Sequence, residues 1–520
     1  MVTTVPLSWR ASRKWRSLIG ALLSAVMLFG AFPPLEWTGL AFIGWTPWAL
    51  AQHGQSDQTK RLLGGLMVGV LFSLISISID PPEVITGASW IALSLAIGAV
   101  AGLIAAMIEL PHGPSRLTQR LGPWSFVWMP ALAWTGLDYL RLITTAGHQW
   151  GMFSTTQVDM APLRAFLPIA GMWPLTLLTV ATGLAIAAGV LIFLGHLAPT
   201  RSLCLAISAV VVGWTLGCVL AIGTPDPSGP KFRVAAVQTG EHVPEHPQTQ
   251  PLITTRQYPE LTDVITTLHT PATVRAAHAK AALVVWPEAS GWIAPDDPNA
   301  TPQINRVQAL ARRTSVAIVW PYFIRIDPDQ TRNEIVVVAT NGNVATPTTK
   351  DHPVYVIGER SVTAGLHRTY RVNGIPIGLA AGPDGTYTDT ITRLAKLGAR
   401  LVAIPTHDWE AFTRQHIKHL RMRAAEHRVA LVKADWRYGS VVIAPSGAVI
   451  ASTSATEKRD ELLIADVHLT EQGSLYTWTG DWAGICGLLT LSLMASASIG
   501  TRPWTRHVNG AQRESSTRPN

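Results

Sequence analysis

The chain has 520 residues, enough for two or three domains. Only 14% of its residues are charged, against roughly 25% in ordinary soluble domains, and 48% are hydrophobic. This composition argues against a purely soluble protein. The net charge of +8 would also suit a nucleic-acid surface, but the Lys and Arg residues gather at the ends of apolar runs, where they act as topology signals.

A helix that spans a membrane needs about 20 mostly apolar residues, because a bilayer core of roughly 30 Å offers the backbone no water. Eight stretches qualify, seven before a long polar region and one after it. They lie near residues 17–33, 38–53, 62–80, 88–110, 123–142, 167–195, 203–223 and 482–500. The first follows a basic segment and so resembles a secretion signal, but six more apolar stretches follow, and we expect it to stay as an anchor.

The basic connections all fall on one side of an eight-span arrangement, which marks that side as cytoplasmic. They contain Lys60, Arg61, Arg116, Arg120 and Arg201, together with both ends of the chain. We therefore expect a multi-pass protein of the cell (inner or plasma) membrane with both termini in the cytoplasm. The predicted domains are a seven-helix region (1–223), an extracytoplasmic domain (224–480), an eighth helix (481–500) and a basic cytoplasmic tail (501–520).

The extracytoplasmic region begins with the linker "GTPDPSGPK" and then alternates short β-branched runs with helical patterns. Helices are expected near 255–280, 302–313, 387–397 and 411–427. The expected strands are "FRVAAVQ", "AALVVWPE", "VAIVWPYF", "NEIVVVAT", "PIGLAA", "ARLVAIPT", "VALVKA" and "GSVVIAPSG". Because these runs are almost continuously apolar, the strands should be buried on both faces, which predicts sheets covered by helices in a layered α/β domain. This region has no cysteine, since Cys204, Cys218 and Cys486 all lie in apolar stretches, so it offers no disulfide framework or cysteine zinc site.

Several motifs stand at the ends of these strands. "VVWPEAS" places Glu288 just after one strand, "NGNVATPTTKDHPVYVIGE" contains Lys350 and Glu359, and "LVAIPTHDWEAF" ends a third strand at "THDW". The helix "RQHIKHLRMRAAEHR" follows. Together with "LLSAVMLFGAFPPLEWTGLAFIGWTPWALA", "AWTGLDYLR" and "GHQWGMFSTTQ" near the spans, this order of motifs resembles the apolipoprotein N-acyltransferase family, the membrane-embedded branch of the nitrilase or carbon-nitrogen hydrolase superfamily.

The resemblance implies an αββα sandwich and a site in which a Glu is the general base, a Lys stabilises the oxyanion and a Cys forms a thioester with an acyl chain from phospholipid. The acyl chain then passes to the amine of a lipoprotein. Glu288 matches the base and Lys350 the oxyanion partner, and both residue types suit those tasks. The predicted substrate-binding residues are Glu359, Gly382, Asp384, Trp409 and His416. No metal or other cofactor is expected, and His148, His352, His407 and His416 lack the spacing of metal ligands.

One motif departs from the family pattern, which reads roughly Gly-x-x-x-Gly-x-x-x-Cys-Tyr-Glu. In "GIPIGLAAGPDG" the position of the cysteine is occupied by Gly382, followed by Pro383 and Asp384. A shift of register does not restore the cysteine, and the nearby hydroxyls of Thr386 and Tyr387 lie past the turn. The loop "RSVTAGLHRTYRVN" is also shorter than its counterpart in the family, so the acceptor need not be a lipoprotein.

Three functions are therefore open. The protein could move an acyl chain from phospholipid to an envelope acceptor (a lipid, a glycolipid or a lipoprotein) without a thioester. It could instead be a pseudoenzyme that binds lipid or lipoprotein, or a structural partner in an envelope complex. Retention of Glu288 and Lys350 favours acyl transfer, and loss of the cysteine favours the pseudoenzyme. An amidase for soluble substrates is disfavoured, because eight spans around a site imply a membrane-borne substrate.

Overall fold

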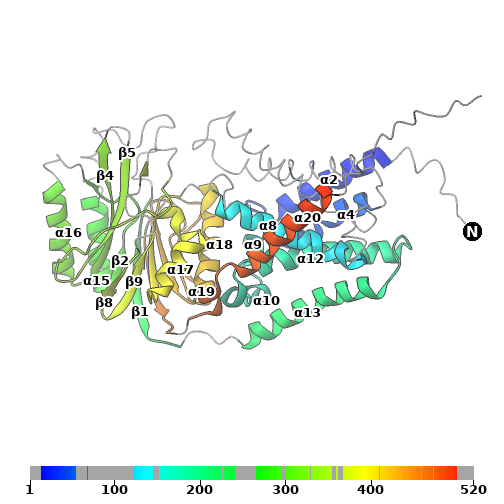
Figure 1. The fold of residues 1–520 in the computed structure, drawn as a ribbon. Coiled ribbons are helices and arrows are strands. Elements are labelled where there is room, and N and C mark those ends of the chain that lie inside the picture. Colours follow the sequence, from blue (N-terminus) through cyan, green and yellow to red (C-terminus); the bar gives the residue numbers. More distant parts are fainter. Residues whose placement is uncertain are drawn as a thin grey trace, which may run out of the picture.

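The structure of the protein is a computed structural model in which a helical region and an α/β domain lie end to end (Figure 1). It describes residues 13–53, 67, 69, 122–144, 151–223, 228–240, 265–293, 300–327, 330–353, 359–360, 367–408, 410–457, 459–471 and 473–500. The stretches expected to span near 62–80 and 88–110, and the tail after 500, lie almost entirely outside these residues.

Within its described residues, the helical region contains five long helices and several short ones. The long ones are α2 (Arg13–Gly30), α8 (Ser125–Ile143), α12 (Trp173–Phe193), α13 (Arg201–Gly223) and α20 (Trp482–Gly500). The short ones are α3 (Leu40–Ile43), α4 (Thr46–Gln52), η1 (Gly122–Trp124), α9 (Phe153–Gln157), α10 (Ala161–Arg164) and α11 (Leu167–Ala170). Among the described residues, α12 and α13 are long and apolar enough to cross a membrane, as predicted. That α2, α8 and α20 also cross it stays a prediction.

The stretch 38–53 does not form the one continuous helix that was expected, and whether its two short helices together cross the membrane stays a prediction. The chain forms two short helices there, α3 and α4, which meet at Gly44 and Trp45. Pro47 lies in the first turn of α4, where its missing N–H costs no helical hydrogen bond, so a new helix can begin there. A Cβ at Gly44 would come within 2.6 Å of Leu28 Cδ2, which shows how closely this bend packs on α2.

Helices α8 and α20 lie side by side and are held together by two glycines. A Cβ at Gly136 of α8 would lie only 2.4 Å from the carbonyl of Gly487 in α20. Small residues of this kind let two helix backbones approach closely, so that van der Waals contacts replace the hydrophobic driving force that is absent in lipid. The C-terminal helix is therefore fixed to the helical region by backbone contact.

Gly136→Ala should lower the melting temperature of the full chain in detergent. The added methyl group has no room, and overpacking of this kind costs about 1–3 kcal/mol. Gly189→Ala in α12 is the matched control, because a Cβ there meets nothing within 4 Å and alanine favours a helix over glycine. Equal shifts in the two variants would contradict the proposed close contact.

The α/β domain contains two mixed sheets. The first has the order β14-β1-β2-β4-β5-β6, with β3 beside β4 and β7 beside β5, and the second has the order β13-β12-β11-β10-β9-β8. The strands of the first are β1 (Lys231–Thr239), β2 (Leu283–Val285), β3 (Trp292–Ile293), β4 (Ala317–Asp327), β5 (Gln330–Val338), β6 (Thr348–Thr349), β7 (Glu359–Arg360) and β14 (Asp460–His468). Those of the second are β8 (Thr369–Val372), β9 (Ile375–Leu379), β10 (Leu401–Thr406), β11 (Ala430–Asp435), β12 (Val441–Ile443) and β13 (Val449–Ser452).

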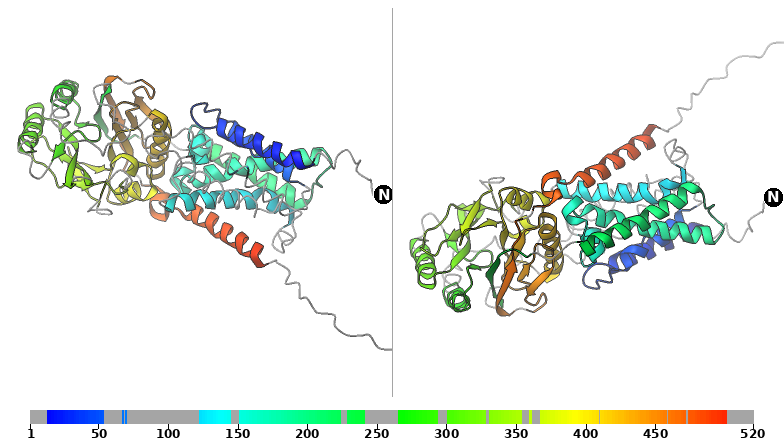
Figure 2. Two further views of the ribbon diagram at one scale, coloured as in Figure 1. Left: turned by 90° about the horizontal axis from the view of Figure 1, so that it is seen from above. Right: turned by 90° about the horizontal axis from the view of Figure 1, so that it is seen from below.

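Helices cover the outer face of each sheet, and a hydrophobic core fills the space between the sheets (Figure 2). On the first sheet lie a π-helical turn (Ile265–His269), α15 (Thr270–His278) and α16 (Ala300–Thr314). On the second lie α17 (Thr388–Lys396) and α18 (Glu410–His427). This is the predicted αββα sandwich. The parallel strands β1, β2 and β4 of one sheet and β9, β10 and β11 of the other end at the same edge of the domain.

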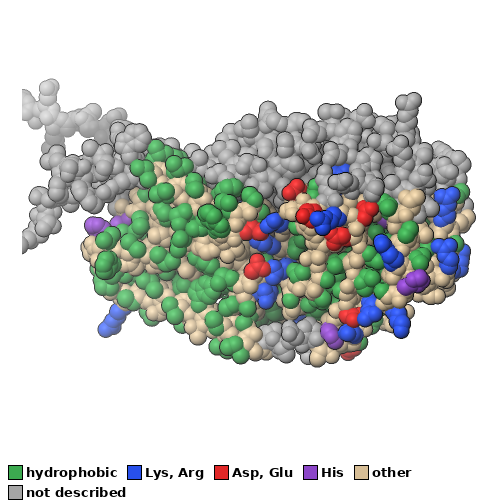
Figure 3. All heavy atoms as spheres, turned by 180° about the vertical axis from the view of Figure 1, so that it is seen from behind, with side chains coloured by type: hydrophobic (Ala, Val, Ile, Leu, Met, Phe, Trp, Pro, Cys, Tyr) green, Lys and Arg blue, Asp and Glu red, His purple; other side chains and the backbone are tan. Residues whose placement is uncertain are grey.

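Helix α18 joins the α/β domain to the helical region through charged and polar side chains. Arg414 and Lys418 both contact Glu36, at 2.9 Å and 2.8 Å. The backbone N–H of Gly151 donates to Gln415 Oε1 at 3.1 Å. Figure 3 shows hydrophobic side chains covering much of the helical region, whereas most of the visible charged groups gather over the α/β domain and this junction.

Candidate functional site

Glu288 is held from two sides at the point where the sheets meet. It follows β2 of the first sheet, and its backbone N–H donates to the carbonyl of Thr406 at the end of β10, 3.3 Å away. Its own carbonyl accepts a hydrogen bond from the indole N–H of Trp436, just after β11. Only 6% of Glu288 is exposed. Both sheets therefore fix the backbone of this residue, and its carboxylate is buried.

The carboxylate of Glu288 is paired with Lys350. Lys350 Nζ lies 3.2 Å from Glu288 Oε1, and Lys350 is only 3% exposed. The side-chain amide of Asn333, in the neighbouring strand β5, donates to the same oxygen. Asn333 also accepts the backbone N–H of Lys350 through its carbonyl, at 3.1 Å, so one residue aligns both members of the pair.

Gly382 lies directly beside this pair. It opens the 3₁₀ turn η5 (Gly382–Gly385), which follows β9 of the second sheet. A Cβ at this position would lie 3.1 Å from Glu288 Oε2, 3.3 Å from Glu288 Oε1 and 3.4 Å from Lys350 Nζ. The backbone of Gly382 has a φ of +49°, in the left-handed region that side-chain-bearing residues rarely adopt. The three predicted positions thus come together, with no side chain at the third.

Asp384 does not point at Glu288 but at the segment that follows Lys350. Its carboxylate accepts the backbone N–H groups of Asp351 at 2.8 Å and His352 at 2.7 Å. It also accepts the N–H of Ala381 at 3.3 Å. These contacts tie the Gly382 turn to the Lys350 segment. A role for Asp384 in substrate binding stays a prediction.

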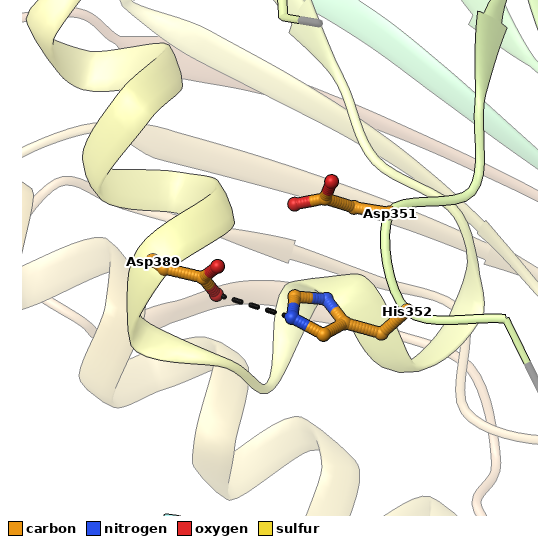
Figure 4. Close-up of side chains that lie close together, drawn as sticks. All are labelled: Asp351, His352 and Asp389. Carbon is orange, nitrogen blue, oxygen red and sulfur yellow. Dashed lines mark ion pairs between the residues drawn. The ribbon is translucent and has the colours of Figure 1, made fainter. Parts of the chain in front are cut away.

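His352 lies between two carboxylates. Its Nδ1 is 3.3 Å from Asp384 Oδ1, and its Nε2 is 3.4 Å from Asp389 Oδ1. Figure 4 shows Asp351 and His352 on one segment and Asp389 reaching the imidazole from α17. Burial opposes a charge on the ring, but hydrogen bonds to Asp384 and Asp389 outweigh it and raise the pKa of His352 to about 10. The ring is therefore a cation at neutral pH.

Asp351, His352 and Asp389 stand close enough for one oxygen or nitrogen of each to bind a single metal ion. The charges around them already balance without one, because Arg393 lies 3.2 Å from Asp351 Oδ2 and 3.0 Å from Asp389 Oδ2. His367 is also 3.2 Å from Asp351 Oδ2. We therefore interpret this group as a set of ion pairs.

His416 belongs to a second buried group of charges at the ends of β10 and β11. Its Nδ1 lies 2.9 Å from Asp408, and Asp408 is also 2.9 Å from the fully buried Lys433. Burial favours the neutral acid, but the charges and hydrogen bonds of His416 and Lys433 lower the pKa of Asp408. Lys433 further contacts Asp435, at 3.1 Å. His416 thus takes part in an ion network, and a contact of His416 with substrate stays a prediction.

For two other predicted residues, Trp409 and Glu359, the structure describes no side chain. Trp409 and the side chain of Glu359 lie outside the described residues. The backbone of Glu359 is in β7, opposite Thr331 of β5. Of the hydroxyl residues near Gly382, Thr386 Oγ1 donates to the carbonyl of Pro383 at 2.6 Å, and the ring of Tyr387 stacks on His352.

Sequence reasoning missed Asn333 as a partner of the base, Trp436 as a donor to its carbonyl, and His352 as part of the site. Asn333 begins "NEIVVVAT", so its place in a strand was predicted, but strand pairing alone puts it beside Glu288. His352 follows Lys350 by two residues. This short spacing from Lys350 was the signal in the sequence that could have placed His352 at the site, but it does not match the spacing of metal ligands.

Comparisons with known proteins agree with this geometry. Residues 233–476 match the carbon-nitrogen hydrolase domain, and this defines the class of the α/β domain. Residues 24–185 match the apolipoprotein N-acyltransferase N-terminal domain. The chain therefore combines an apolipoprotein N-acyltransferase N-terminal domain with a carbon-nitrogen hydrolase domain, the combination that the sequence motifs indicated. No curated protein matches it.

Similar solved structures include an amidase of Nesterenkonia sp. AN1 from the nitrilase superfamily. A mutant of this amidase shares 20% identity over 47% of this chain and 94% of its own, with a TM-score of 0.38. Its complex with butyramide gives 20% identity, the same two coverages and a TM-score of 0.37. A mutant with an acetamide moiety added at the active-site cysteine gives 20% identity, 50% and 97% coverage and a TM-score of 0.38.

Replacing His352 by Gln should destabilise the protein in a pH-dependent way. The folded protein raises the pKa of His352 from about 6.5 to about 10, so its ionic contribution to stability is complete below about pH 6.5 and fades as the pH rises towards 10. The melting temperatures of the wild type and His352→Gln should therefore differ most near pH 6 and converge by about pH 10. A difference that stays constant over this range would contradict the assigned charge.

Proposed function

We propose that the protein is a membrane acyltransferase that moves an acyl chain from phospholipid to an envelope acceptor without a cysteine thioester. The acceptor is a lipid, a glycolipid or a lipoprotein. The observation that carries the proposal is the placement of Glu288, Lys350 and Gly382. A side chain at 382 would face both charged groups, with its Cβ 3.1 Å from Glu288 Oε2 and 3.4 Å from Lys350 Nζ, and glycine places no side chain there.

Transfer then takes place in one displacement through a tetrahedral intermediate. The acceptor hydroxyl or amine lies beside Gly382 and gives its proton to Glu288 as its oxygen or nitrogen attacks the ester carbonyl carbon of the phospholipid. Negative charge develops on the carbonyl oxygen, where the Lys350 ammonium stabilises it. The C–O bond to the phospholipid breaks, Glu288 returns the proton to the leaving oxygen, and a lysophospholipid departs.

The contacts around Glu288 support its role as base. Asn333 and Lys350 both bind Oε1, while Oε2 is the oxygen closest to the Cβ position at residue 382, at 3.1 Å. The first oxygen therefore anchors the carboxylate and the second is directed towards the acceptor. Loss of the cysteine removes the covalent route, but the positioned base and the ammonium remain, and electrostatic stabilisation is often the larger contribution.

The helical region supports a membrane-borne substrate. The match to the apolipoprotein N-acyltransferase N-terminal domain and the two long apolar helices α12 and α13 agree with a membrane location. We infer that eight spans hold the chain in the cell membrane with both termini in the cytoplasm. The α/β domain (224–480) then stands outside, between the seventh span and the eighth, where it can take an acyl chain from the outer leaflet.

A second candidate is a catalytically inactive protein that binds lipid or lipoprotein, or that scaffolds an envelope complex. The specific observation in its favour is the same glycine, which supplies no nucleophile beside Glu288 and Lys350. Comparing the acylated lipids and lipoproteins of envelopes with and without the gene separates the two candidates. Loss of one acylated species indicates an enzyme, whereas unchanged acylation with altered complexes indicates a scaffold.

Glu288→Gln should reduce acyl transfer in reconstituted liposomes by about 100-fold or more, because the amide cannot accept the acceptor's proton. The measurement is the transfer of labelled acyl chain from phospholipid to extracted envelope acceptors. Glu410→Gln, at an exposed position at the start of α18, is the matched control and should keep full activity. Unchanged transfer by Glu288→Gln would remove Glu288 as the base.

Gly382→Cys should restore a covalent intermediate. Its thiol would face Glu288 and Lys350, so incubation with phospholipid should yield an acyl adduct that hydroxylamine removes. The adduct can be measured by intact-protein mass spectrometry. Gly374→Cys is a suitable control, because a Cβ there meets nothing within 4 Å and it also has a positive φ, of +80°. An adduct at neither position, in correctly folded protein, would contradict a surviving acyl-transfer geometry.

A further inference from the structure

The Lys350 segment and the Gly382 turn follow strands of different sheets. Lys350 follows β6 of the first sheet, and Gly382 follows β9 of the second. These sheets face each other across the core and share no hydrogen-bonded strand pair among the described residues. Backbone hydrogen bonds such as that from Glu288 to Thr406 join the sheets, and contacts that cross directly between the Lys350 segment and the Gly382 turn fix the distance between those two segments.

Asp384 supplies the first of these contacts. It accepts the backbone N–H groups of Asp351 and His352, which come directly after Lys350. The Asp384 carboxylate in η5 thus binds the backbone of the segment that follows β6 of the other sheet. This contact fixes the backbone of the Lys350 segment, but it does not by itself hold the segment from its far side.

His352 supplies the second set of contacts, and all its partners follow Gly382 in the chain. Nδ1 contacts Asp384 at 3.3 Å and Nε2 contacts Asp389 at 3.4 Å. The ring stacks on Tyr387, with centroids 3.8 Å apart and planes 10° from parallel. One imidazole from the Lys350 segment therefore contacts the turn η5, the N-cap residue of α17 (Tyr387) and the first turn of α17.

The geometry of His352 requires a protonated ring. A neutral imidazole has a donor at only one nitrogen, so its other nitrogen would turn a lone pair towards a carboxylate. A protonated ring donates at both. The charged and titratable groups around it are Asp384 and Asp389 in direct contact, Asp351 and Lys350 on its own segment, and Tyr387, His367 and Arg393 packed nearby.

We propose that His352 is a positioning residue that, as an imidazolium held between Asp384 and Asp389, keeps Lys350 beside the Gly382 turn. It acts through Lys350 and does not touch the reacting atoms. This inference rests on the proposed function, because it assigns His352 to the same site. Its test uses the geometry of the site and not turnover, so that an inactive protein leaves the test intact.

The test places a reporter thiol at residue 382. Gly382→Cys is made in a full chain whose Cys204, Cys218 and Cys486 are replaced by Ser, and the protein is held in phospholipid nanodiscs. The rate of alkylation by iodoacetamide is measured from pH 5 to 10, because only the thiolate reacts. Lys350 lowers the apparent pKa of this thiol and the Glu288 carboxylate raises it, so the profile with His352 in place is the reference and the test reads the change from it.

Adding His352→Gln should shift this apparent pKa upwards by about one unit, because Lys350 is no longer held in place, and so slow alkylation at pH 7 by roughly tenfold. His468→Gln is the matched control, since it is the same substitution at an exposed histidine of β14 whose imidazole contacts the carbonyl of Gly229. It should leave the rate profile unchanged. Superimposable profiles with and without His352→Gln would overturn the proposal.

Amide hydrogen exchange in the full chain without the reporter cysteine provides a second, independent readout. His352→Gln should speed exchange both in residues 350–353 and in residues 381–386, since the imidazole joins the two segments, and His468→Gln should speed it in neither. Faster exchange in only one segment, or in none, would show that His352 does not connect them. This result decides the matter even where a cysteine at 382 is not alkylated.

Discussion

The arrangement of the two sheets in the α/β domain depends on the buried ion pair between Glu288 and Lys350. A single charge removed from water costs several kcal/mol, and a partner offsets that cost only in good geometry with further hydrogen bonds. The chain provides both, with Nζ and Oε1 at 3.2 Å and the amide of Asn333 on the same oxygen. Because strands β5 and β6 pair, Asn333 and Lys350 stay in register. The two sheets must therefore keep a fixed relation at this edge, and Trp436 and Thr406 extend that requirement to the second sheet.

Gly382 shows that the position beside the ion pair can lack a side chain while the pair itself stays intact. Glycine adds no charge and no volume beside the pair, so the loss of a nucleophile leaves the ion pair and its hydrogen bonds in place. The left-handed backbone at 382 suits glycine better than a residue with a side chain, so the turn keeps its shape without strain. The geometry of the charged pair therefore does not depend on a side chain at residue 382.

The sequence predicted the sandwich and the three central positions because those features have local signals. Continuous apolar runs marked the parallel strands, and "VVWPEAS" ends such a run at Glu288. Contacts between segments far apart in the chain had no such signal: the hydrogen bond from Asn333 and the pairing of His352 with Asp389 depend on strand order and on the placement of α17. The break in the stretch 38–53 was missed for a different reason. Hydropathy measures how apolar a stretch is, and the bend at Gly44 is as apolar as a straight helix.

The helical region is also connected to the site. Arg423, fully buried on α18, donates to the carbonyl of Thr386, which follows the Gly382 turn, and contacts Met172 Sδ at the start of α12. Asp481, before α20, accepts hydrogen bonds from Thr388 of α17 and from the indole of Trp173 in α12. Both sets of contacts reach residues just after the turn that carries Gly382. A shift of α12 or α20 would therefore displace the residues that follow the Gly382 turn before it displaced the strands. For this reason the site is better understood as part of one unit with the helices than as a soluble hydrolase placed on an anchor.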